Sequence, residues 1–221
     1  MNGKDITFDV DGKSVAGYLA VPGQPNAPGV ILLHAWWGLN SIFKDLCDRL
    51  ASEGFVAFAP DLYNGKIAKT IDEAKQLMPE NEEEQIHPIV AVAPDFLRDR
   101  PEVSKDPLSV IGFSMGAAWA LVLASERPED IGKMVLFYGN YEGLGVSKIR
   151  ADILGHFADM DEFEPLEGVR ATEAAMRTAR LSPTFYVYPD TKHWFFENDR
   201  PEFNPQAAEL AWTRTLEFLR G

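Results

Sequence analysis

The sequence is poor in cysteine and has no long apolar run. Its one cysteine, Cys47, cannot form an internal disulfide, and its place on a helical stretch predicts a small buried side chain. No run of about 18 uncharged apolar residues occurs, so no membrane-spanning helix is predicted. The first ten residues, MNGKDITFDV, lack the basic and apolar segments of a signal peptide. A cytoplasmic protein is therefore expected.

Positive charge is also scarce. The chain has 21 Lys and Arg against 34 Asp and Glu, which gives a net charge of −13. Such an excess of acid argues against nucleic-acid partners and against anionic membrane surfaces. The partner expected from charge alone is a small molecule that carries no large negative charge.

What the sequence does contain is an alternation of apolar strands with helices. Its 221 residues, 46% of them hydrophobic, suffice for one large domain over residues 1–221. The opening stretch predicts two strands joined by a tight turn at Asp11-Gly12. The alternation that follows is typical of an α/β fold, with a mostly parallel sheet and helices on both faces. Strands are predicted in GVILLHAWWG, FVAFAP, residues 108–111, KMVLFYG, DILGHF and TFYVYP.

The helices are predicted from apolar spacing and from their start and stop signals. The first should begin at an N-cap, Ser41, and stop at Gly54. A segment after Glu82 is expected to be broken by Pro88 and Pro94. The other helices are predicted at residues 70–78, 115–126, about 167–180 and 205–219.

The stretch GFSMG, residues 112–116, lies between a predicted strand and a predicted helix. The pattern G-x-S-x-G in this setting places its serine on a sharp turn, where the hydroxyl is exposed beyond the sheet. A side chain at either glycine would crowd that turn. Ser114 is therefore the candidate nucleophile, and a serine in an ordinary strand-to-helix loop is the alternative.

A serine needs a base to take its proton, and the base is usually a histidine oriented by a carboxylate. On α/β-hydrolase scaffolds the chain order is serine, acid, histidine. Among the four histidines only His193 both follows a predicted strand and leaves room for an acid after Ser114. His156, inside the strand DILGHF, is interpreted as a packed strand residue.

Two aspartates compete for the role of the acid. Asp159 and Asp161 both lie in the loop after the strand DILGHF, whereas Asp152 comes at the start of that strand. Reasoning from the residues alone does not separate Asp159 from Asp161.

Motifs spread over nearly the whole chain resemble the dienelactone hydrolase family of α/β-hydrolases: HAWWGLN, APDLYNG, VIGFSMGAA, FADMDEFEP and KHWFFE. The resemblance implies a triad of Ser114, Asp161 and His193, since the family pattern places the acid four residues before a proline, here Pro165. It also implies the backbone N–H of Trp36 as an oxyanion donor, beside that of Met115, which the nucleophile motif itself supplies. The short segment 140–151 leaves no room for a cap domain.

The sequence also departs from the family pattern. The cysteine nucleophile of the name-giving enzymes is Ser114 here, and their glutamate after the third strand is Ala35. Gly65 and Glu197 stand where those enzymes have arginines for a substrate carboxylate, so an acidic dienelactone is not expected. Aromatic side chains are predicted to line an apolar pocket instead, although about half could simply pack in the core. They are Trp37, Tyr63, Phe113 and Trp194.

The sequence thus predicts a serine hydrolase, a carboxylesterase-like enzyme that cleaves small esters or lactones through an acyl-enzyme on Ser114. It is expected to act as a monomer or homodimer, with no cofactor, metal, nucleic acid or membrane. One alternative is an acyltransferase or a peptidase for small substrates that uses the same triad. Another is a ligand-binding relative that has kept the fold without the activity.

Overall fold

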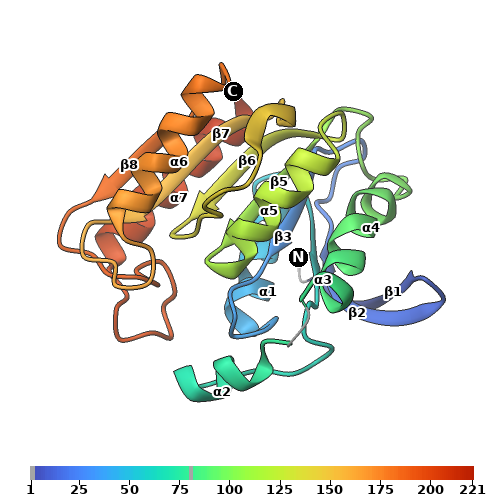
Figure 1. Ribbon diagram of the computed structural model, residues 1–221. Coiled ribbons are helices and arrows are strands. Elements are labelled where there is room, and N and C mark those ends of the chain that lie inside the picture. The colour runs from blue at the N-terminus through green and yellow to red at the C-terminus, as the bar shows by residue number, and fades with distance from the viewer. Residues whose placement is uncertain (1–2, 80–81) are drawn as a thin grey trace. The chain divides into compact units, whose positions relative to one another are not determined.

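The computed structural model describes residues 3–79 and 82–221 (Figure 1). The chain forms two compact units, Met1–Val110 and Ile111–Gly221, and it passes from one to the other within strand β5 (Leu108–Phe113). The expectation of one domain over residues 1–221 stays a prediction. Among the described residues no helix is long and apolar enough to cross a membrane.

The first unit begins with the predicted hairpin, in which Asp11 and Gly12 form the turn with φ angles of 51° and 77°. The second hairpin strand pairs antiparallel with β4, and β4 pairs parallel with β3. The strands are β1 (Lys4–Val10), β2 (Lys13–Ala20), β3 (Gly29–Leu33) and β4 (Val56–Pro60), in the order β1-β2-β4-β3 and then the first half of β5. Its helices are α1 (Ser41–Ser52), α2 (Ile71–Leu77), α3 (Glu82–Gln85) and α4 (His87–Arg98).

Two helix boundaries in this unit differ from the prediction. The N-cap of α1 is Asn40, whose side chain accepts hydrogen bonds from the N–H groups of Ile42 and Phe43, so Ser41 is the first helical residue. Helix α4 continues through Pro94 to Arg98, so this proline does not break it. Pro94 is buried with the apolar face of α4, and this packing outweighs the lost backbone hydrogen bond.

The second unit carries the second half of β5 and then β6, β7 and β8, in that order, with β6-β7 and β7-β8 parallel. In Figure 1, α6 lies in front of these strands and α7 behind them, so both faces of this part of the sheet are covered. The elements are β6 (Ile131–Phe137), β7 (Asp152–Ala158), β8 (Thr184–Tyr188), α5 (Met115–Glu126), α6 (Leu166–Thr178), α7 (Pro205–Arg220) and the short 3₁₀ helix η1 (Val146–Lys148).

The central strands are buried along almost their whole length. All residues of β3, β4 and β5 are buried, as expected for parallel strands covered on both faces. The segment between β6 and β7 contains only η1 and holds no cap domain. The predicted class, a mostly parallel α/β-hydrolase sheet with an N-terminal antiparallel hairpin, is confirmed.

Candidate active site

Ser114 occupies a strained turn between β5 and α5. Its φ of 52° lies in the left-handed region, which costs a non-glycine residue roughly 1–3 kcal/mol. A Cβ atom at Gly112 would overlap with the carbonyl oxygen of Gly116, so the turn can form only with glycine at position 112. The backbone N–H of Ser114 donates to the carbonyl oxygen of Phe137 at 2.9 Å, which fixes the turn against β6.

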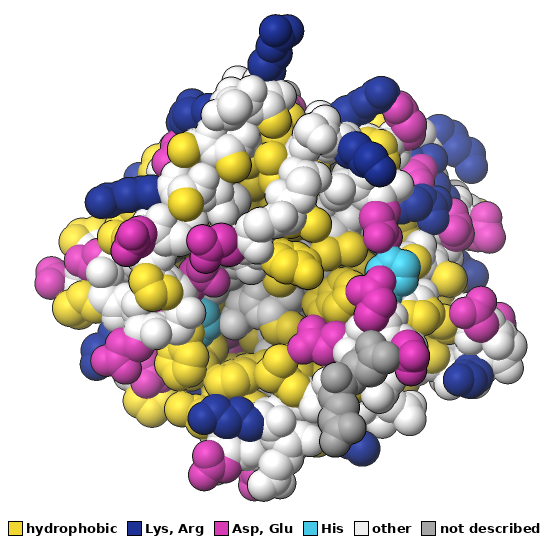
Figure 2. Space-filling model, viewed as in Figure 1, with side chains coloured by type: hydrophobic (Ala, Val, Ile, Leu, Met, Phe, Trp, Pro, Cys, Tyr) yellow, Lys and Arg dark blue, Asp and Glu magenta, His cyan; other side chains and the backbone are white. Residues whose placement is uncertain are grey.

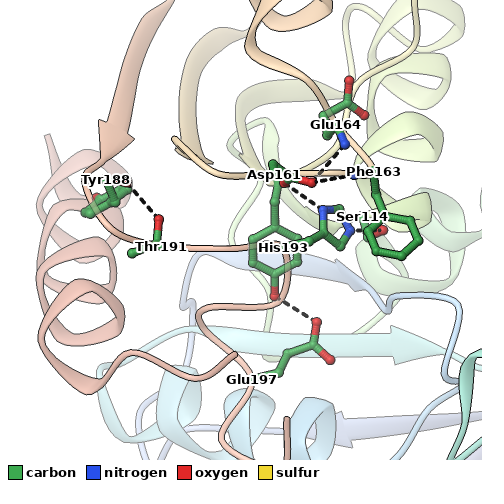
Figure 3. A network of polar contacts seen from close by, with 9 residues as sticks. Ser114, Asp161, Phe163, Glu164, Tyr188, Thr191, His193 and Glu197 are labelled. Carbon is green, nitrogen blue, oxygen red and sulfur yellow. Dashed lines mark hydrogen bonds and ion pairs between the residues drawn. The ribbon is translucent and has the colours of Figure 1, made fainter. Parts of the chain in front are cut away.

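Three side chains form a continuous hydrogen-bonded chain at this turn. Ser114 Oγ lies 2.9 Å from His193 Nε2, and His193 Nδ1 lies 2.7 Å from Asp161 Oδ2. Figure 3 shows the three groups pointing toward one another. The side chains of His193 and Asp161 are only 6% and 1% exposed, whereas Ser114 is half-buried. Of the three hydrogen-bonded residues, Ser114 is thus the one most accessible to solvent.

The protons of this chain follow from the chemistry of its ends. An ionised carboxylate only accepts hydrogen bonds, so Nδ1–H of His193 donates to Asp161. The other ring nitrogen, Nε2, is then the acceptor for the Ser114 hydroxyl. A neutral imidazole in this tautomer can take the serine proton.

The structure separates the two aspartates between which the residues alone could not decide. Asp161 Oδ2 contacts His193, and its Oδ1 accepts the N–H groups of Phe163 and Glu164 at 2.9 and 2.8 Å. Asp159 instead accepts the N–H groups of Asp190 and Thr191, both at 3.0 Å. Asp159 therefore joins the loop after β7 to the loop after β8, and Asp161 is the carboxylate at the histidine.

His156, on β7, is enclosed in the core of the second unit. The hydroxyl of Thr215 donates to the carbonyl oxygen of Ala211 at 2.8 Å, so its oxygen accepts Nε2–H of His156 at 3.1 Å. Nδ1 of His156 then accepts the hydroxyl of Tyr188 at 2.8 Å. Burial, and then the nearby Arg214, lower the pKa of His156 to about 3. The interpretation of His156 as a packed strand residue is confirmed.

A buried pair, Tyr138 and Glu197, lies next to the histidine of the site. The Tyr138 hydroxyl donates to Glu197 Oε1 at 2.8 Å, and its ring meets the His193 ring edge-on with centroids 5.0 Å apart. Glu197 is fully buried, and this burial raises its pKa to about 8. Sequence reasoning noticed Glu197 only as a lost arginine. The available signal was a glutamate, four residues after His193, that directly follows the apolar run WFF.

A second titratable group missed by sequence reasoning is Glu164, which follows Asp161 in the same loop (Figure 3). Partial burial, and then the Asp161 carboxylate, raise the pKa of Glu164 to about 7, while hydrogen bonds from Asn140 act in the opposite direction. Glu197 and Glu164 thus place two carboxyl groups with raised pKa values near the Asp161–His193 pair.

The predicted pocket residues fall into different surroundings. Phe113 and Trp37 are each 1% exposed, and the Phe113 ring stacks on Phe137 with centroids 4.5 Å apart, so both contribute to the cores of their units. Tyr63 lines a hollow of about 380 Å³ in the first unit. Trp194 lines a recess of about 80 Å³ in the second unit, beside His193. A substrate contact stays a prediction for all four.

The two predicted oxyanion donors are backbone groups. Met115 is the first residue of α5 and directly follows Ser114. Trp36 lies in the first unit, in the turn after β3. Both roles stay predictions.

Charges are mixed over the face of the molecule in Figure 2, where Lys and Arg side chains lie among Asp and Glu. Within residues 3–79 and 82–221, no group of three His, Cys, Asp or Glu side chains is placed to hold a metal ion.

Comparison with known proteins decides the family. The model of the dienelactone hydrolase family matches residues 15–221. The chain belongs to the dienelactone hydrolase family. "Protein usf" of Aquifex pyrophilus is 34% identical over 99% of this chain and 98% of its own. A protein of Aquifex aeolicus, named "Putative carboxymethylenebutenolidase", is 30% identical over the same shares.

Solved structures of the family share the fold. Dienelactone hydrolase from Anabaena variabilis superposes with a TM-score of 0.73 at 18% identity, covering 100% of this chain and 98% of its own. At that identity the likeness speaks for the fold alone. The resemblance drawn from the motifs is confirmed, and with it the prediction that the chain is a hydrolase.

Proposed function

We propose that this member of the dienelactone hydrolase family is a serine hydrolase that cleaves small neutral esters or lactones through an acyl-enzyme on Ser114. The observation that carries the proposal is the unbroken chain from Ser114 Oγ through His193 to Asp161, with contacts of 2.9 and 2.7 Å. Family membership already makes the chain a hydrolase of ester or lactone bonds. The serine nucleophile, the acyl-enzyme, a cytoplasmic location and a monomeric or homodimeric state belong to the proposal.

The first half of the reaction forms the acyl-enzyme. His193 Nε2 takes the hydroxyl proton as Ser114 Oγ attacks the carbonyl carbon of the substrate, and the backbone N–H of Met115 donates to the resulting oxyanion. Asp161 stabilises the imidazolium. When the tetrahedral intermediate collapses, the ester C–O bond breaks, and the leaving oxygen takes the proton from Nε2.

The second half releases the acid. Water enters, gives a proton to His193 Nε2 and attacks the acyl carbon, and the bond to Ser114 Oγ breaks as Nε2 returns the proton to the serine. For a lactone the leaving oxygen stays attached to the acyl chain, so one hydroxy acid is released.

The charge near the site favours neutral substrates. Glu197 stands where the family resemblance expects an arginine, and its carboxyl is buried against Tyr138. With a net charge of −13, the chain also gives no long-range attraction to an anion. An anionic lactone would therefore lack the counter-charge that the name-giving enzymes supply.

A fluorophosphonate followed by intact-mass measurement tests the proposal. One adduct is expected on the parent protein and none on Ser114→Ala. The matched control is Ser125→Ala, because Ser125 lies on α5, where its hydroxyl faces the carbonyl oxygen of Gly145. An adduct that persists on Ser114→Ala, or a parent that is not labelled, would refute the proposed nucleophile.

A further inference from the structure

The position of the leaving group follows from the role of His193. The proton that Nε2 takes from Ser114 must be delivered to the oxygen of the departing alcohol, so that oxygen has to come within about 2.6–3.2 Å of Nε2. Side chains that lie beside Nε2 of His193 therefore also flank the alcohol part of an ester. The carbonyl oxygen of the ester points instead to the oxyanion donor, the backbone N–H of Met115 in the proposed mechanism.

A recess of about 80 Å³, lined by both apolar and charged side chains, lies against this histidine. Phe163 and Trp194 form its walls, with ring centroids 5.3 and 4.9 Å from that of His193 and 4.8 Å from each other. Met160 also lines it. The two aromatic rings and the imidazole thus contact one another at steep angles of 43°, 83° and 48°, so a bound ring can stack on one of them and touch the edge of another.

Two of these apolar side chains are unusually open to solvent for their size. Met160 is 46% and Phe163 is 47% exposed, whereas Trp194 is only 4% exposed. Large apolar groups exposed together beside a reactive centre are typical of ligand sites.

The recess is held in place by the site itself. The N–H of Phe163 donates to Asp161 Oδ1 at 2.9 Å, while Oδ2 of the same carboxylate holds His193. The N–H of Met160 donates to the carbonyl oxygen of Thr191 at 3.0 Å, which ties the other side of the recess to the loop of His193. The backbone that carries the apolar wall therefore has a fixed position relative to Nε2, and the site itself loses little conformational entropy when a group binds.

The rim of the recess is acidic overall. Glu162 and Glu202 line it together with one cation, Lys192. An alcohol that carries a negative charge would meet a net negative rim, whereas a neutral one would not.

We infer that the recess formed by Met160, Phe163 and Trp194 is the leaving-group subsite, and that it selects esters of neutral aromatic alcohols. The inference rests on the proposed serine mechanism, because it is His193 that fixes which part of the ester lies there. It goes beyond that mechanism by assigning a substrate class and the residues that select it.

The test compares acetate esters that share one acyl group. In the variant Phe163→Ala, kcat/KM for 2-naphthyl acetate should fall about 10-fold, since stacking on an aromatic wall is lost. For ethyl acetate it should stay within about 2-fold, because a small alkyl alcohol makes little use of the ring. Hydrolysis of the acetyl-enzyme, measured after a burst, should be unchanged, since the alcohol has already left.

A matched control is Phe203→Ala. Phe203 is 36% exposed in the same unit and does not line the recess, so this variant should leave both esters unaffected. Phe163→Leu keeps an apolar side chain without the ring and should give an intermediate loss. The para-carboxylate analogue of phenyl acetate should be a poorer substrate than phenyl acetate, and Glu162→Gln should reduce the difference.

The failures of the two proposals are distinguishable. If Phe163→Ala lowers kcat/KM equally for both acetates, or changes only the preference among ethyl esters of different acids, the leaving-group assignment is overturned while the serine mechanism stands. If the parent is not labelled by a fluorophosphonate and cleaves none of the esters, the proposed function itself is wrong.

Discussion

His156 and His193 belong to the same unit and differ in every feature that decides whether a histidine can move a proton. His156 carries its proton on Nε2, between Tyr188 and Thr215, and the hydrogen-bond chain ends at a backbone carbonyl. His193 carries its proton on Nδ1, held by Asp161, and presents Nε2 to a half-buried serine. The two rings are thus in opposite tautomers.

The contrast shows that burial alone does not make a histidine catalytic or inert. Both rings are buried, at 0% and 5% exposure for the whole residues. The hydrogen-bond partners of His156 are hydroxyl groups, which do not stabilise a protonated imidazole as a carboxylate would, and the nearby Arg214 disfavours its positive charge. For His193, a carboxylate stabilises that charge and the far end of the chain is open to a substrate.

The strongest test of the contrast is to remove the hydroxyl group that is hydrogen-bonded to His193 Nε2. Ser114→Ala should lower turnover on a short-chain aryl ester by on the order of 10⁴ to 10⁶, because the covalent step is lost. The melting temperature should change little, because alanine occupies the same turn with the same φ and only the side-chain hydrogen bond to His193 is lost. Steady-state rates and a thermal melt are the measurements. Retention of even a tenth of the rate would remove Ser114 from the mechanism.

The next test changes the tautomer of His193. Asp161→Asn should lower turnover by roughly 10⁴, because an amide can donate to Nδ1 and so favour the wrong tautomer. Asp159→Asn is the matched control and should leave turnover within a few fold, since the Asp159 carboxylate accepts the N–H groups of Asp190 and Thr191 and holds no histidine nitrogen. If the two effects were reversed, Asp159 would be the acid.

Substitution of His156 should lower the stability of the protein and leave its turnover almost unchanged. His156→Leu leaves the hydroxyl proton of Tyr188 without its acceptor, and it should lower the free energy of unfolding by about 1–3 kcal/mol. Turnover per folded molecule should stay within about 2-fold. Denaturant unfolding and active-site titration measure the two quantities. A rate loss comparable to that of Asp161→Asn would mean that His156 takes part in proton transfer after all.

The smallest effect is the pH dependence that Glu197 brings to the neighbourhood of His193. Burial raises its pKa to about 8 from an ordinary 4.5, so the native protein keeps a proton that the unfolded chain has released. Its contribution to stability is therefore full below pH 4.5 and is lost as the pH rises through about 8.

Glu197→Gln removes this titration. The variant should be more stable relative to the parent at about pH 9 than at about pH 5, which melts at the two pH values will show. Glu164→Gln should show the same sign over a lower range, because the pKa of Glu164 is raised to about 7. A melting-temperature difference that is the same at both pH values would contradict the buried, protonated state of Glu197.

Much of this contrast could be predicted from local pattern. Residues 115–126 form the helix expected of them, and His156 was separated from His193 by its place inside a strand. These predictions succeed because each depends on signals within a few residues: apolar periodicity, glycines around a serine, and a position just after a strand.

What local pattern alone could not decide depends on partners distant in the chain. The choice between Asp159 and Asp161 turns on which side of the loop faces His193, 32 residues later. The Tyr138–Glu197 pair joins residues 59 apart, and no local pattern pairs them. Pro94 lies inside α4 because the packing of this helix compensates for the lost backbone hydrogen bond. Asn40 and Ser41 both suit the N-cap position, so the sequence does not show that Asn40 occupies it.

The two oxygen atoms of Asp159 have a consequence for protein engineering. They fasten residues 190 and 191 to the loop after β7, and Met160 is fastened back to Thr191. These hydrogen bonds join two stretches of the chain, residues 159–165 and 189–196, into one structural unit. Grafts that exchange one stretch with a homologue would misalign the histidine against its carboxylate, whereas chimeras that exchange both together would transplant a new alcohol preference with the reactive centre intact.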